Sequence, residues 1–285
     1  MDQQQPLLQA LAAEDPEIAE RLVTRRSAIA RGAATTSAVA AGLRMASVPV
    51  ALAALSRDAF GQQALPAVVI GVLNYALILE ELEYEFYQRG TDAAGLIPAA
   101  DRPIFENIRA HELDHRDFLR RTLGGAARPK PTFDFTAGNG SNAGPYAGLF
   151  TPGNYATFTA VAQAFEDTGV RAYKGQAPAL IPYKDVLTAA LTIHSVEARH
   201  ASEVRRLRGG FADMGPFGQG WINGNQTDVP GAAAVYAGED NVVQGGADLS
   251  TLTFTPPVAR NEITEAFDEP LTQAQVLAIV DPFIV

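Results

Sequence analysis

The sequence contains no cysteine among its 285 residues, and charged residues make up only 19% of it. Without cysteine the protein can form no disulfide, thiolate nucleophile or iron–sulfur cluster, and it has no rubredoxin-type metal domain. Positive charge is also scarce, because 22 Lys and Arg residues face 32 Asp and Glu residues, for a formal net charge of −10. This balance argues against nucleic acid or an anionic membrane surface as a partner.

Hydrophobic residues make up 47% of the chain, which is long enough to bury a sizeable core. Length and composition together predict one main domain with extensions. We expect three parts: a signal-like segment over residues 1–61, a helical bundle over 62–210 and an irregular C-terminal extension over 211–285.

One pattern of ionisable residues occurs twice. A Glu-x6-Tyr pair is followed by a Glu-x-x-His pair, and the separation between the two pairs is nearly the same in both halves. In chain order the residues are Glu80, Tyr87, Glu112, His115, Glu166, Tyr173, Glu197 and His200. Such a trace is typical of the duplication of a helical hairpin.

Helical geometry explains the spacing. Residues three apart share one helix face, so Glu112 and His115 can bind the same ion, as can Glu197 and His200. A separation of seven is almost two turns, which places Tyr87 on the stripe of Glu80. The stripes are otherwise apolar, so we expect the ionisable residues to point into the core.

The cost of burial then indicates a metal centre. Four unpaired carboxylates in one interior would each cost several kcal/mol. Two divalent cations would neutralise them, and two imidazoles would complete the ligand set. A glutamate from each of two helices plus a Glu-x-x-His from each of the other two is the general description of di-iron and di-manganese bundles. The predicted metal ligands are Glu80, Glu112, His115, Glu166, Glu197 and His200.

On these motifs, residues 66–208 resemble the ferritin-like superfamily, and most of all the bacterial ferritin-like domain proteins related to plant desiccation-related proteins. The resemblance implies an all-α four-helix bundle with a long connection between its second and third helices. It also implies two iron or manganese ions that react with dioxygen or peroxide, or the binding and oxidation of ferrous iron. A homo-oligomer would be in keeping with this family.

The N-terminal segment resembles a twin-arginine export signal. Arg25 and Arg26 precede an apolar run of small residues from about 33 to 55. Ala28 and Ala30 depart from the usual pattern, so an ordinary amphipathic helix is the alternative. The resemblance predicts export to the periplasm or cell envelope, with association with the envelope as a further expectation.

Helix signals predict the remaining elements. The four helices are expected over about 66–90, 101–123, 155–174 and 183–208. The Pro-, Gly- and Asn-containing stretch 126–154 is expected to be the long connection. In the extension, residues 249–254 are strand-like, and a short helix is expected up to about Val280, packed with the apolar tail on the bundle.

Several neighbouring residues carry alternative interpretations. Glu81, Glu83 and Asp167 lie close to the predicted ligands, and Glu83 could be an extra ligand or, as we expect, a surface charge. His194 could support the metal site or be a buried histidine. His111 is expected to point outward.

Tyr87 and Tyr173 are the candidate catalytic residues. They could be core aromatics, but their matched offset favours hydrogen bonds that steady Glu80 and Glu166. The run from His111 to His115 also matches a zinc-protease pattern, although a protease needs no second Glu-x-x-His. A non-enzymatic envelope or desiccation-protection protein with a structural metal stays open as the alternative function.

Overall fold

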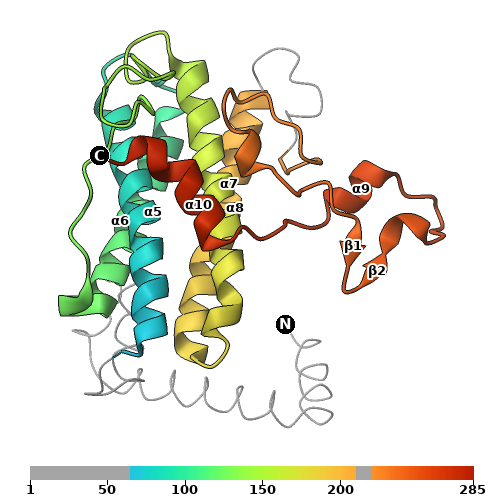
Figure 1. The fold of residues 1–285 in the computed structure, drawn as a ribbon. Coiled ribbons are helices and arrows are strands. Elements are labelled where there is room, and N and C mark those ends of the chain that lie inside the picture. The colour runs from blue at the N-terminus through green and yellow to red at the C-terminus, as the bar shows by residue number, and fades with distance from the viewer. Residues whose placement is uncertain (1–64, 210–219) are drawn as a thin grey trace, which may run out of the picture. The chain divides into compact units, whose positions relative to one another are not determined.

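The fold is described by a computed structural model that covers residues 65–209 and 220–285. Four long helices dominate this part of the chain (Figure 1). They are α5 (Ala67–Asp92), α6 (Arg102–Leu123), α7 (Tyr155–Leu180) and α8 (Lys184–Gly209). The predicted all-α four-helix bundle is confirmed. The signal-like segment 1–61 lies outside the described residues, so export stays a prediction.

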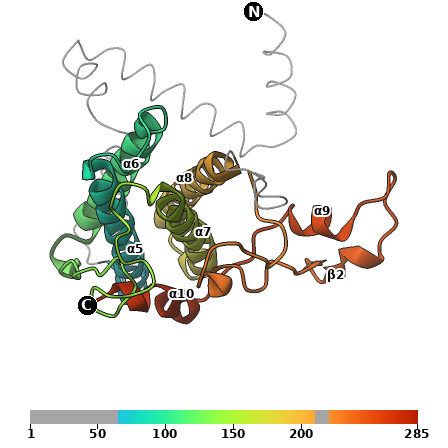
Figure 2. The same ribbon diagram turned by 90° about the horizontal axis from the view of Figure 1, so that it is seen from above.

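The helices pack as two hairpins. α5 lies against α6 and α7 against α8, and α5 and α7 then join the hairpins (Figure 2). No helix in the described ranges is long and apolar enough to cross a membrane. The hairpin arrangement follows from the short connections within each pair and the long connection between the pairs.

The observed helix ends agree with the expected ones within two residues, except at the end of α7. That helix continues six residues beyond Lys174, through Gly175, to Leu180. Gly175 is needed for another reason, because a Cβ added there would lie 1.9 Å from the backbone oxygen of Leu271. The glycine therefore admits the C-terminal extension to the helix surface and does not end the helix.

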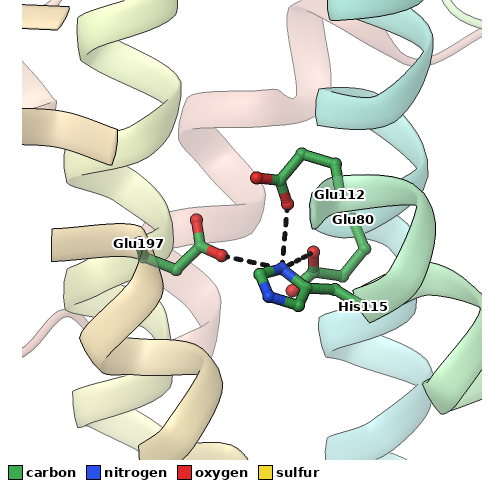
Figure 3. A group of neighbouring side chains, drawn as sticks. All are labelled: Glu80, Glu112, His115 and Glu197. Carbon is green, nitrogen blue, oxygen red and sulfur yellow. Dashed lines mark hydrogen bonds and ion pairs between the residues drawn. The ribbon is translucent and has the colours of Figure 1, made fainter. Parts of the chain in front are cut away.

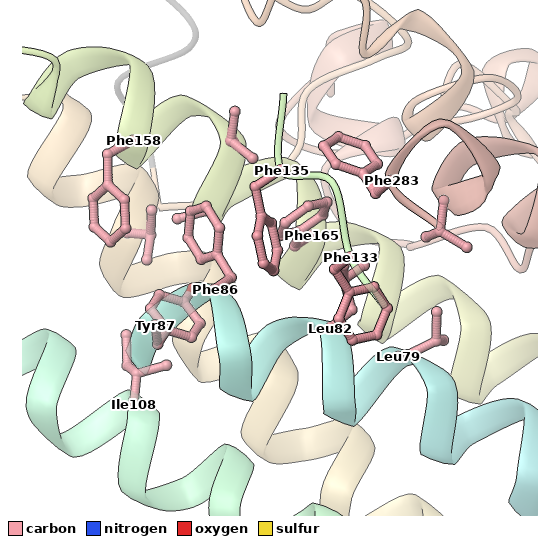
Figure 4. Close-up of a cluster of buried hydrophobic side chains, with 14 of the residues drawn as sticks. Leu79, Leu82, Phe86, Tyr87, Ile108, Phe133, Phe135, Phe158, Phe165 and Phe283 are labelled. Carbon is pink, nitrogen blue, oxygen red and sulfur yellow. The ribbon is translucent and has the colours of Figure 1, made fainter. Parts of the chain in front are cut away.

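An aromatic cluster fills the bundle beside α5 and α7 (Figure 4). Phe86 stacks on Phe158 with ring centroids 4.8 Å apart. Phe135 from the long connection and Phe283 from the tail complete the cluster. Segments far apart in sequence thus share one core, whose aromatic pairs add to the free energy of area burial.

The long connection between α6 and α7 is ordered around one carboxylate. A short 3-10 helix, η1 (Gly124–Ala126), leads into it. Asp134 then accepts hydrogen bonds from the backbone N–H groups of Thr136, Gly140 and Asn142. The first half of the connection also forms backbone hydrogen bonds with the tail, including one from the Val285 N–H to the Thr132 carbonyl. This connection is the predicted crossover.

The extension contains short elements in place of the predicted strand over 249–254. Strands β1 (Val243–Gln244) and β2 (Ala247–Asp248) form an antiparallel hairpin, and residues 249–251 form a 3-10 turn. The hairpin forms earlier because Gly245 and Gly246 both take positive φ, which a two-residue turn requires. The remaining elements are η3 (Ala233–Val235), η4 (Leu249–Thr251), α9 (Arg260–Thr264), α10 (Gln273–Val280) and η5 (Asp281–Phe283).

The tail packs on the bundle, as expected. Leu271, Val276 and Val280 are at most 1% exposed. Buried Arg171 on α7 binds the extension by pairing with Glu239 at 2.8 Å and donating to the Glu269 carbonyl. The C-terminal tail and the segment around Glu239 are therefore part of the domain's core, whereas β1 and β2 are largely exposed.

Gly175→Ala should destabilise the protein by about 1–3 kcal/mol, because the new methyl group would clash with the Leu271 backbone. Gly71 is the matched control, since it is also helical and a Cβ there meets nothing within 4 Å. Gly71→Ala should stabilise the protein by about 0.5–1 kcal/mol through helix propensity. Urea unfolding followed by circular dichroism measures both changes. Equal stabilisation by the two substitutions would show that the extension does not lie against α7.

Candidate metal centre

Six buried side chains from all four long helices meet inside the bundle. They are Glu80 from α5, Glu112 and His115 from α6, Glu166 from α7, and Glu197 and His200 from α8. The four glutamates are fully buried and the two histidines are 5% exposed. All six predicted ligand positions therefore lie together.

One candidate ligand set surrounds His115 and is named the His115 site (Figure 3). The His115 Nδ1 atom lies 3.0 Å from Glu112, 3.1 Å from Glu197 and 3.3 Å from Glu80. The carboxylates thus come from three different helices and converge on one imidazole nitrogen. The ligand atoms of this set all lie within 4.8 Å of one another.

The second set, the His200 site, is the counterpart from the other repeat. The His200 Nδ1 atom lies 2.8 Å from Glu112 and 3.2 Å from Glu166. Glu197 completes the set, so Glu112 and Glu197 belong to both sites. Two carboxylates are therefore shared between two sets of side chains, each of which contains one histidine and could hold a metal ion.

Unsatisfied polar atoms show that these residues fit metal ions. In the described part of the chain, eight buried side-chain nitrogen or oxygen atoms lack a hydrogen-bond partner, and six belong to the candidate ligands. Both oxygens of Glu197 and the Nδ1 of His200 are among them. Buried polar groups are normally hydrogen-bonded. These atoms lie within ion-pair distance of one another without forming hydrogen bonds, so an ion placed among them would satisfy them.

In the metal-free site, the pKa values of the candidate ligands are governed by buried carboxylates that lie close together. Burial raises the pKa of Glu80 to about 7, against the opposing effect of His115. Burial also raises the pKa of Glu197 well above its usual value, and Glu112 and Glu80 add to this. Glu112 differs, because the two histidines outweigh burial and hold its pKa below the ordinary range. The histidines themselves have raised pKa values, because the carboxylates around them outweigh burial.

The two tyrosines bond to the ligand glutamates in a crossed arrangement. The Tyr87 hydroxyl on α5 donates to Glu166 on α7 at 2.5 Å. The Tyr173 hydroxyl on α7 donates to Glu80 on α5. The predicted hydrogen bonds from the two tyrosines to Glu80 and Glu166 are therefore present, and each tyrosine bonds the glutamate of the opposite hairpin. Spacing along one helix cannot reveal this, because the partner depends on how the hairpins align.

Glu83 is buried, and its expected place on the surface is wrong. It is 3% exposed, and burial together with nearby Glu197 raises its pKa well above the usual value. Gly169 on α7 makes room for it, since a Cβ there would lie 2.9 Å from Glu197 and 3.3 Å from Glu83. Gly169 follows Glu166 by three residues as Glu83 follows Glu80. The sequence shows this glutamate and this glycine at matched positions of the two repeats, but only the packing of α5 against α7 shows that they face each other.

The other acidic neighbours have partners of their own. Glu81 pairs with Arg120, and Asp167 pairs with Arg205. Asp167 also accepts a hydrogen bond from Tyr236 at 2.7 Å. Neither acid belongs to the candidate ligand sets.

His111 contacts the site, although it was expected to point outward. Its Nδ1 lies 2.9 Å from the Nε2 of His200, and the two rings stack with centroids 5.2 Å apart. His194 instead bonds through Nδ1 to the backbone carbonyl of Val170 at 3.0 Å. His111 is in neither candidate ligand set, which disfavours the zinc-protease pattern, where His111 and His115 would bind one ion.

Comparison with known families gives one match. The profile of the family described as "Ferritin-like domain" matches residues 69–210, which include all six candidate ligands. No curated protein is similar enough to this chain to count as a match.

The metal-free protein should lose stability as pH rises from 5 to 8. The raised pKa of Glu80 means that the folded state keeps a proton that the unfolded chain releases above its ordinary value of 4.5. Folding is therefore favoured below about pH 4.5 and disfavoured progressively up to about pH 7. Glu197 and the two histidines, with raised pKa values, change stability in the same direction. Thermal unfolding after chelation measures this, and a Tm that climbs from pH 5 to pH 8 would contradict it.

Proposed function

Since residues 69–210 belong to the ferritin-like superfamily, we propose that this protein holds two ions of iron or manganese and reacts with peroxide or dioxygen. The observation that carries the proposal is the set of six ligand atoms without a hydrogen-bond partner, three of which belong to the two shared carboxylates. Two ions of such a metal, when bound, would supply the two electrons that reduce one hydrogen peroxide molecule to water.

The donor atoms favour iron or manganese on chemical grounds. Four carboxylates and two imidazoles offer oxygen and nitrogen donors with no sulfur. Four carboxylates also offset the charge of two divalent cations. Zinc or copper would bind a given set of such donors more tightly, so metal supply and geometry decide the occupant.

The protein's own groups position the ligands. Glu112 and His115 are held three residues apart on α6, as Glu197 and His200 are on α8, so the helix backbone sets their spacing. Tyr87 and Tyr173 donate hydrogen bonds that orient Glu166 and Glu80. Glu83 adds a fifth buried carboxylate beside Glu197, which can balance an increase in positive charge.

Elemental analysis should find two ions per chain in the wild-type protein. Glu80→Ala removes a ligand of the His115 site only and should leave one ion. Glu112→Ala removes a ligand common to both sites and should leave none. Glu85→Ala is the matched control, because Glu85 pairs with Arg89 and Lys130 and is no candidate ligand. Equal metal content in all four proteins would exclude the dinuclear centre.

Tyr87→Phe should retain both ions but slow the oxidation of the metal-loaded protein by about 10–100-fold, because Glu166 loses the bond that orients it. Stopped-flow absorption after mixing the anaerobic protein with peroxide measures the rate. Tyr146→Phe is the control, since its hydroxyl bonds to the Pro230 carbonyl away from the site. If the wild type holds two ions yet its absorption does not change with peroxide or with dioxygen, the metal is structural. The proposed enzyme would then give way to the alternative function, a non-enzymatic protective protein.

A further inference from the structure

A groove on the outside of the bundle leads to one of the two metal sites. It has a volume of about 580 Å³ and lies between α6 and α8. Asn107 and His111 line it from α6, and Arg199, His200 and Glu203 line it from α8. His200 is also a candidate metal ligand, so the groove reaches the His200 site from the surface.

Each nitrogen of His200 faces a different environment. Nδ1 lies among the carboxylates, 2.8 Å from Glu112. Nε2 lies 2.9 Å from the Nδ1 of His111, whose half-buried ring stacks on that of His200. The His111 ring therefore lies beside that of His200 where both line the groove.

The contact between the rings determines which nitrogen of His200 carries the proton. A metal bound at Nδ1 requires that nitrogen to be unprotonated, so the proton of the neutral ring must be on Nε2. From there it can be donated to the Nδ1 of His111, which then carries its own proton on Nε2. An outer hydrogen bond of this kind orients a ligating imidazole and fixes its tautomer.

The second repeat has no histidine at the position that matches His111. His111 precedes Glu112, and the residue that precedes Glu197 at the matching position is Val196. A valine side chain can accept no hydrogen bond. The repeats therefore differ where α6 and α8 meet the groove.

We propose that this groove is where a divalent cation enters, and that His111 is the residue that positions His200. The inference depends on the dinuclear function proposed above. A cation that enters by this groove would meet the His200 site before the His115 site, because His200 lines the groove and His115 does not. The His115 site is filled from there through the shared carboxylates Glu112 and Glu197.

The lining suits a hydrated cation that exchanges ligands stepwise. Glu203, Asn107 and His111 offer carboxylate, amide and imidazole donors along the groove. Arg199 is exposed and Glu203 is half-buried. Glu203 also pairs with Arg206 at 3.7 Å, so its charge is offset by nearby arginines and partly screened by water. The lining therefore offers ligands without trapping the ion outside.

Two substitutions at one position test the positioning role. Asn keeps an acceptor near the place of the imidazole Nδ1, whereas Leu, of similar size, has none. Titration with cobalt(II) chloride, followed by its visible absorption, gives the affinity of each site. His111→Leu should lower the affinity for one of the two cobalt ions by about 10–100-fold. His111→Asn should bind both ions with affinities close to those of the wild type. His194→Leu is the control, because His194 bonds to a backbone carbonyl and not to a ligand.

A bulky residue in the groove tests the entrance. Asn107→Trp should slow cobalt uptake several-fold in stopped-flow mixing and leave the final two ions per chain unchanged. Ala110→Trp is the matched control, since Ala110 is exposed on the same helix but does not line the groove. If the Asn107→Trp variant takes up cobalt as fast as the Ala110→Trp variant, the groove is not the entrance.

The outcomes separate the two proposals. A wild-type protein that takes up fewer than two cobalt ions would overturn the dinuclear function itself. A wild type that takes up two, with equal affinities in the His111→Leu and His111→Asn variants, would overturn only the positioning role of His111.

Discussion

Mutual repulsion among buried carboxylates is the constraint on which the rest of this structure depends. Glu80, Glu112, Glu166 and Glu197 are fully buried in one interior, where an uncompensated charge costs several kcal/mol. The two histidines, the two tyrosine hydroxyls and the proposed ions all act against that cost. The apolar bundle around them must be stable enough to hold the site together, and the aromatic cluster and the packed C-terminal extension contribute to this stability.

The crossed tyrosine bonds connect site geometry to the packing of the hairpins. Tyr87 and Glu166 lie on different hairpins, as do Tyr173 and Glu80. Each bond can form only when α5 and α7 dock in register. The ligands are therefore oriented by the same contact that assembles the bundle, and a change in hairpin docking would disturb both sites at once.

Much of the fold and the candidate ligand set could be predicted from the repeated spacing, because a helix face converts sequence distance directly into spatial proximity. Features that depend on how distant segments pack together could not be predicted in this way. Glu83 shares its helix face with Glu80, but only the glycine opposite it, on another helix, shows that it can point inward. The contact of His111 with His200 depends on the approach of α6 to α8. The path of the extension across Gly175 depends on contacts nearly one hundred residues apart in sequence.

The pairing of Glu83 with Gly169 has a consequence for how the two halves came to differ. The crossed tyrosine bonds are those of a two-fold symmetric dimer, in which each copy makes the same contact to the other. A dimer of identical chains would have to place two glutamates, or two glycines, at these matched positions. Two glutamates would collide, and two glycines would leave a void. Joining both hairpins in one polypeptide removes this restriction, so each half can evolve its own side of the centre and the two sites can become chemically unequal.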